Sequence, residues 1–172
     1  MSGVQKSVLL GAIQLLVVLS LSGKLLYDRM ARPRGWALTQ GYDPELPIRG
    51  RYLTQRLRMP AEGFEYTNQK NGNEWYMNRR WAYFEVRGEE LIAKGQGSGA
   101  GGWIFLQKRA DNSLEAVSEE PVLLFVSEHA DVPALKPGEE RWIEVTVPKK
   151  GPPRPIRLGL KKDGKLTPVA LE

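Results

Sequence analysis

The sequence predicts a mainly β protein, with a single N-terminal transmembrane helix followed by an antiparallel β-sandwich or open β-barrel. Two observations support this prediction: an uncharged apolar run near the N-terminus, and a series of short strand-like segments separated by turn residues after it. The length of 172 residues suits one anchor and one domain. We therefore predict a transmembrane anchor over 1–27, a basic juxtamembrane linker over 28–35 and a β-rich domain over 36–172.

The apolar run extends from Ser7 to Gly23 without a charge, and Leu25 to Tyr27 continue it past Lys24. About 20 helical residues cross the hydrocarbon layer of a membrane, and a lysine at the edge can reach the headgroups. A cleaved signal peptide is the alternative, because small residues precede a cut before Gly23. We favour an uncut signal-anchor, because the run is long for a signal peptide and continues beyond that cut.

The charges next to this span bear on the side of the membrane that the domain occupies. Lys6 precedes the span, whereas four cations follow it: Lys24, Arg29, Arg32 and Arg34. The positive-inside rule alone would therefore leave the domain in the cytoplasm. The chain has no cysteine, so the redox state of the compartment gives no further indication.

The net charge of +5 favours an anionic partner. One basic cluster adjoins the predicted span, and a second lies between Lys149 and Lys165. We interpret the lipid bilayer as that partner, because no helical or aromatic nucleic-acid-binding motif accompanies either cluster. A solvated strand face is the alternative for the second cluster.

The strand-like segments follow one another along the rest of the chain. From Tyr52 the sequence YLTQRLRM alternates, which is typical of a half-buried strand with Leu53, Gln55, Leu57 and Met59 on one side. We interpret 60–80, which contains Asn71-Gly72, as a long hairpin or surface excursion. Further strands are predicted at 36–39, 81–87, 91–94, from Trp103 (WIFLQKR), from Pro121 (PVLLFVSE), from Arg141 (RWIEVTVP) and in a hairpin around Asp163-Gly164.

No complete catalytic constellation is recognisable. The pattern Gly97, Gly99, Gly102 satisfies G-x-G-x-x-G but leads into a strand, so it predicts a loop and not a dinucleotide site. His129 is the single histidine and has no cysteine companion, which argues against zinc. We therefore expect no catalytic residue, no metal and no cofactor.

The stretch DPELPIRGRYL, with Asp43, Pro44, Leu46, Gly50 and Tyr52, resembles the bacterial membrane-anchored proteins named for a GDYXXLXY motif. The chain departs from that motif in having Arg51 at the acidic position and Gln55 and Leu57 at the later Leu and Tyr positions. The resemblance implies a β domain anchored in the inner membrane and facing the periplasm. It implies no activity.

The same stretch is similar to the turn that carries the nucleophile in signal peptidases. On that overlay the nucleophilic serine and the following methionine fall on Gly41 and Tyr42, and the next strand, RRWAYFEVR, offers only arginines as a base. Glycine has no oxygen to attack a peptide bond, and arginine stays protonated near neutral pH. This resemblance therefore implies a related β domain without the chemistry.

The opening turn is interpreted as mainly structural, because prolines restrict φ and glycine permits unusual backbone. Its residues are Asp43, Pro44, Leu46, Pro47 and Gly50. The candidate binding residues are Arg49, Arg51, Tyr52, Trp75 and Tyr76, with Phe64 and Tyr66 as further exposed aromatics. We expect a non-catalytic, membrane-anchored envelope protein that binds a protein partner or assembles a complex. An envelope hydrolase and a cytoplasmic-side regulator of a membrane complex are the alternatives.

Overall fold

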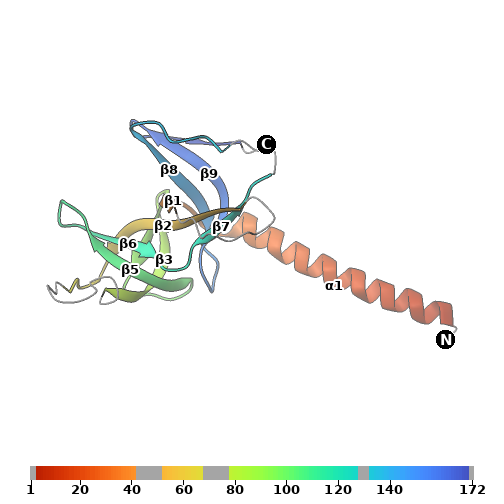
Figure 1. The fold of residues 1–172 in the computed structure, drawn as a ribbon. Coiled ribbons are helices and arrows are strands. Elements are labelled where there is room, and N and C mark those ends of the chain that lie inside the picture. The colour runs from red at the N-terminus through yellow and green to blue at the C-terminus, as the bar shows by residue number, and fades with distance from the viewer. Residues whose placement is uncertain (1–2, 42–51, 68–77, 128–131, 171–172) are drawn as a thin grey trace. The chain divides into compact units, whose positions relative to one another are not determined.

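The computed structural model describes residues 3–41, 52–67, 78–127 and 132–170 (Figure 1). The chain divides into two compact units, of which the first ends at Arg32 and the second begins at Pro33. We describe each unit by itself.

The first unit is the helix α1, Gly3–Ala31. Its segment Gly3–Tyr27 is long and apolar enough to cross a membrane, a property that a membrane anchor and a signal sequence share. Ser7 Oγ donates to Gly3 O at 3.2 Å and Ser20 Oγ to Val17 O at 2.9 Å, so both hydroxyls are satisfied within the helix. The helix extends beyond the predicted anchor to Ala31, because no proline interrupts it before Pro33.

The second unit is built of strands, which confirms the predicted β domain behind one apolar N-terminal helix. The described strands are β1 (Arg34–Gly41), β2 (Tyr52–Glu62), β3 (Arg79–Arg87), β4 (Glu90–Lys94), β5 (Gly101–Lys108), β6 (Leu114–Ser118), β7 (Val122–Phe125), β8 (Glu139–Thr146), β9 (Arg154–Lys162) and β10 (Lys165–Pro168). The pairing is mainly antiparallel, as predicted, and the parallel contacts of β4 with β1 and β2 are the exceptions among the described strands.

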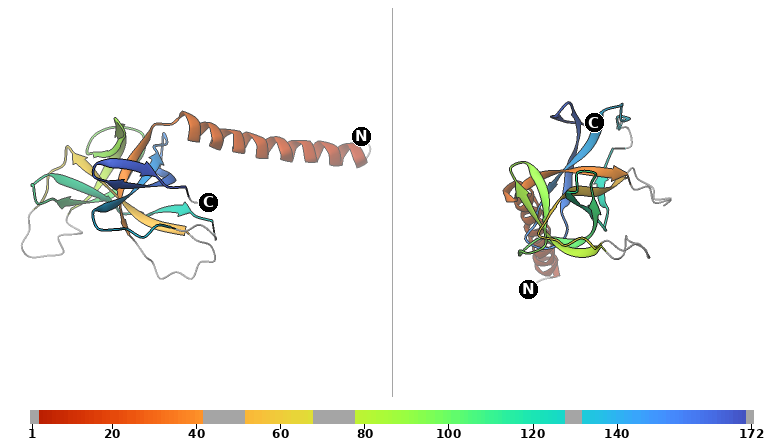
Figure 2. Two further views of the ribbon diagram at one scale, coloured as in Figure 1. Left: turned by 90° about the horizontal axis from the view of Figure 1, so that it is seen from above. Right: turned by 90° about the vertical axis from the view of Figure 1, so that its left-hand side faces the viewer.

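The sheet closes on itself as a barrel (Figure 2). Its strand order is β10-β9-β8-β1-β4-β3-β5-β6-β2-β7, and β1 also pairs with β2. On one edge β1 pairs with β8 from Arg34 to Leu38; on the other it pairs with β2 from Leu38 to Gly41. The ring therefore runs through β1, β4, β3, β5, β6 and β2, with β8, β9 and β10 extending from β1 and β7 extending from β2.

Local sequence signals placed most of these strands correctly. In β2 the buried residues Gln55, Leu57 and Met59 share one side of the strand, as the alternation of a half-buried strand predicted. The hairpin at Asp163-Gly164 forms with φ of 49° and 79°, the left-handed pair that a two-residue turn requires. The glycine-rich stretch is a loop between β4 and β5 that ends inside β5.

Two features differ from the sequence interpretation. Strand β2 continues through Pro60 to Glu62, into the stretch expected to be a surface excursion. On this edge of β2, the residues up to Arg58 pair with β1 and the residues from Ala61 onward pair with β4. Pro60 lies between these two sets, so the ladder tolerates its missing backbone N–H. Strand β6 was not predicted, because LEAVS is short and places a carboxylate among its apolar residues.

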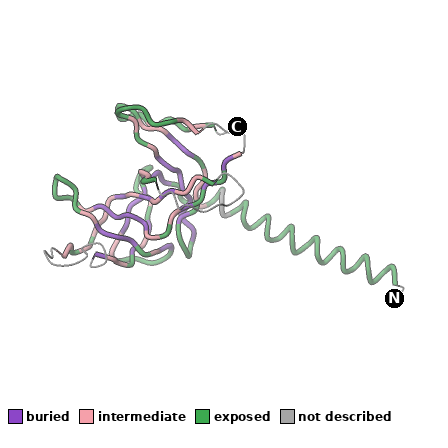
Figure 3. The backbone as a smooth tube through the Cα atoms, viewed as in Figure 1, coloured by how far each residue is buried: buried purple, intermediate pink, exposed green. Residues whose placement is uncertain are grey.

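The core lies inside the barrel, where the strands carry their buried residues (Figure 3). Leu57, Ile104 and Ile143 come from three different strands and are fully buried, and each such side chain contributes about 1.5–3 kcal/mol when removed from water. Trp36 packs against β9 at Gly159, where a Cβ would lie 2.7 Å from the indole ring. Only glycine leaves room for this indole.

A buried carboxylate holds β6 to its neighbours. The side chain of Glu115 is 1% exposed and accepts from two arginines: Arg58 Nε and Nη2, at 3.0 Å and 2.5 Å, reach Oε2, while Arg109 Nε reaches Oε1 at 3.0 Å. The bond from Arg109 raises the pKa of that guanidinium. The side chains of Arg58 and Arg109 stay 33% and 44% exposed, so both retain contact with water.

Replacing Glu115 tests this arrangement. We expect Glu115→Gln to lower the free energy of unfolding by about 2 kcal/mol, because charge-assisted bonds at a buried site are lost while both arginines can still hydrate. Tryptophan fluorescence during urea unfolding reports the β domain selectively, since all five tryptophans follow Pro33. Glu65→Gln, at an exposed position, is the control and should stay within about 0.5 kcal/mol. Equal effects of the two substitutions would contradict a structural role for Glu115.

A second ion pair predicts a pH response. Arg87 Nη1 and Nη2 donate to Glu62 Oε1 and Oε2 at 2.6 Å and 2.8 Å, and these bonds lower the pKa of Glu62. A carboxyl whose pKa is lowered on folding contributes stability above its ordinary pKa and loses that contribution as the pH falls through the lowered value. An NMR titration of the Glu62 side chain should show this pKa rising toward 4.5 in Arg87→Gln. An unchanged pKa in that variant would remove Arg87 as the cause.

Candidate binding surface

The described part of the β domain exposes few large apolar side chains, and most of them lie together. Five form what we call the apolar band, with exposed fractions between 41% and 66%: Tyr52, Trp81, Trp103, Leu123 and Phe125. The sixth, Leu135, belongs to the segment between β7 and β8. Clustered apolar exposure of this kind marks interaction sites more often than scattered single residues do.

One end of the band is the outer face of β2 and β7. Tyr52 pairs with Phe125 across the two strands, and their rings meet edge to face with centroids 5.6 Å apart. Leu123 is two residues before Phe125 and faces the same side, as the period of a strand dictates. Among the described strands β7 pairs only with β2, so it forms one edge of the sheet.

The other end of the band is the outer face of β3 and β5. Trp81 pairs with Trp103, and their rings meet edge to face at 5.5 Å. The Arg79 guanidinium carbon lies 4.0 Å from the centroid of the Trp103 ring, and its Nη2 bonds to Glu119 Oε2 at 2.8 Å. A cation fixed over an indole holds that ring in one orientation.

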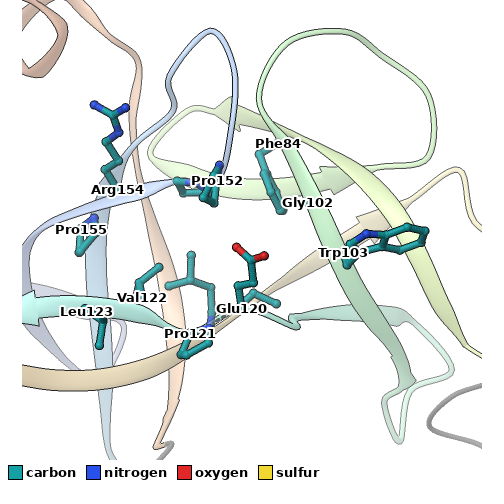
Figure 4. Close-up of a pocket in the computed structure, with 13 residues that line it drawn as sticks. Phe84, Gly102, Trp103, Glu120, Pro121, Val122, Leu123, Pro152, Arg154 and Pro155 are labelled. Carbon is teal, nitrogen blue, oxygen red and sulfur yellow. Dashed lines mark hydrogen bonds between the residues drawn. The ribbon is translucent and has the colours of Figure 1, made fainter.

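A pocket of about 160 Å³ connects the two ends (Figure 4). Both Trp103 and Leu123 line it. The rest of its lining is mainly apolar, with one carboxylate and one guanidinium: Leu57, Phe84, Gly102, Ser118, Glu120, Pro121, Val122, Pro152, Pro153, Arg154 and Pro155. Four of these are prolines, whose fixed φ makes this lining stiff.

The size and lining of the pocket restrict what it can accept. Small-molecule sites typically enclose roughly 300–1,000 Å³, so this pocket is small for a cofactor or a metabolite. One apolar side chain of a partner protein suits it better, with Glu120 and Arg154 available to polar groups beside that side chain. In the described ranges, no cluster of three or more His, Cys, Asp or Glu side chains has the arrangement of a metal site.

The structure places only part of the predicted site. Tyr52 lies in the apolar band. Gly41, the residue at the nucleophile position of the signal-peptidase overlay, is the last residue of β1. Outside the described residues lie the other candidate binding residues, the predicted structural turn and the single histidine: Arg49, Arg51, Trp75, Tyr76, Asp43, Pro44, Leu46, Pro47, Gly50 and His129.

Two expected surface aromatics require correction. Phe64 and Tyr66 are partly buried and pack against the core. The sequence interpretation missed Trp81, Trp103, Leu123 and Phe125 as surface residues, because apolar residues in strand patterns predict burial. A usable signal existed in VLLF, where apolar residues occupy both faces of a short strand.

Comparisons of the chain with protein-family models, with curated proteins and with solved structures find no match. The site is therefore interpreted from its own geometry.

Proposed function

We propose that this protein is a single-pass, membrane-anchored β domain of the bacterial envelope that acts by binding a protein partner, without catalysis. The observation that supports the proposal is the apolar band, which contains five of the six exposed large apolar side chains in the described β domain. Exposing these apolar side chains to water is unfavourable compared with covering them by a partner protein.

The composition of the band favours a protein as the partner. Tryptophan, tyrosine and arginine are the residues that contribute most to protein–protein binding when they surround a well-packed centre. Trp103, at the pocket, already carries Arg79 on its ring, so that part of the surface is ordered before binding. Ordering in advance lowers the entropy lost on association.

The edge position of β7 suggests how the partner docks. A strand at a sheet edge can pair with an extended segment through its backbone. In this proposal such a segment lies along β7 and inserts an apolar side chain between Leu123 and Trp103. Backbone pairing would supply affinity, and the pocket would select the side chain.

Photocrosslinking in native cells tests the partner surface. A photoreactive residue at position 125 should yield a discrete adduct with one protein, whereas the same residue at position 135 should not, because Leu135 is outside the apolar band. Trp103→Ala should weaken the adduct at 125, with an expected loss of affinity of about 30-fold, as for a binding hot spot. Equal crosslinking at 125 and 135 would remove the apolar band as the docking site.

Membrane topology tests the location. Reporters active in opposite compartments, fused after Glu172, should place the domain outside the cytoplasm, and an immunoblot should show uncut length. The four cations that follow the span favour the opposite orientation. A cytoplasmic result would overturn the envelope location and favour the regulator of a membrane complex, while a shortened product would replace the anchor by a signal peptide.

A further inference from the structure

The connection between β8 and β9 lies beside the start of the β domain. Val147 N donates to Pro33 O at 3.0 Å, which attaches the first residue of this loop to the first residue of the second unit. Arg32 alone separates Pro33 from Ala31, the last residue of α1. The loop is therefore attached to the end of the domain at which the chain leaves the helix.

This end of the domain is basic. Lys149 and Lys150 are exposed in the loop. Arg34, Thr146 and Arg154 are partners in one row across β1, β8 and β9, so the two arginines project on the same face of the sheet. The loop therefore adds cations to those that follow the span in the sequence.

The neighbouring elements contribute fewer opposing charges. The glycine-rich loop lies beside the lysines, since a Cβ on Gly99 would be 3.6 Å from Lys149 O, and its residues 95–100 are uncharged. The turn before β4 brings Glu89 near β1, because Trp36 N donates to Glu89 O at 2.7 Å. Glu90 adjoins it, and Glu120 lines the pocket with Arg154. Cations outnumber these three carboxylates at this end of the described domain.

We propose that Lys149 and Lys150, with Arg34 and Arg154, bind the phosphates of anionic lipid headgroups in the leaflet that the domain faces. Each basic residue near such a surface contributes about 1 kcal/mol, within a screening length of about 8 Å. The bond to Pro33 holds the start of the loop at the end of the domain that the chain links to the predicted span, although the loop is more than a hundred positions away from that span in the sequence. The inference rests on the uncut anchor of the proposed function and adds a second, reversible contact that docks the domain on the membrane.

Energy transfer in lipid nanodiscs tests this contact with the full chain. The protein has no cysteine, so Ser98→Cys, in the exposed loop beside Lys149, carries a unique fluorescent donor, with an acceptor on the lipid. Transfer should be higher in discs that contain phosphatidylglycerol than in purely zwitterionic discs. It should fall to the zwitterionic level in about 0.5 M NaCl, where screening is nearly complete.

The decisive variant is Lys149→Gln with Lys150→Gln, which should lower the ratio of docked to undocked domain up to about 30-fold, from two charges at about 1 kcal/mol each. The matched control is Lys108→Gln with Lys165→Gln, which removes the same charge from the last residue of β5 and the first residue of β10. Equal transfer in both lipids, or an equal loss in the control, would overturn the lipid site. Absence of transfer in every disc would instead show that the anchor itself is missing, which would overturn both proposals.

Discussion

The pairing of β1 with β2 is the contact on which the rest of the structure depends. Backbone groups at the edge of a sheet need partners, and β1 satisfies both of its edges by binding β8 on one side and β4 and β2 on the other. This pairing closes the ring around the core, to which Leu57 of β2 and Ile104 of β5 belong. The first residues of β2 extend beyond the end of β1 at Gly41. Strand β7 pairs with these residues of β2 and exposes Leu123 and Phe125.

Closure also explains why a carboxylate is buried on β6. The strand is covered on both faces, and Glu115 is tolerated there because Arg58 and Arg109 supply charged donors to both of its oxygens. The two arginines reach the site from β2 and from the turn after β5. The site is thus stabilised by residues far apart in sequence, and it fixes β6 against its neighbours at low cost because the arginines stay hydrated.

The domain presents two different surfaces. The apolar band contains aromatic and aliphatic side chains around a pocket, whereas the β8–β9 loop beside Pro33 presents lysines. Arg154 belongs to both, since it lines the pocket and lies in the row with Arg34. In our interpretation, docking on lipid through the loop would set how the apolar band is presented to a partner.

By itself, the sequence determined the features that depend on near neighbours. Apolar length specified α1, alternation specified that β2 is buried on one side, and Asp163-Gly164 specified a hairpin through its left-handed backbone. Tertiary structure decided whatever depends on distant pairing: the closed barrel, the burial of Glu115, the exposure of Trp81 and Trp103, and the position of Val147 beside Pro33. The period of a strand determines which side chains share a face. Only the pairing and packing of the strands determine whether that face is buried by protein or exposed to water.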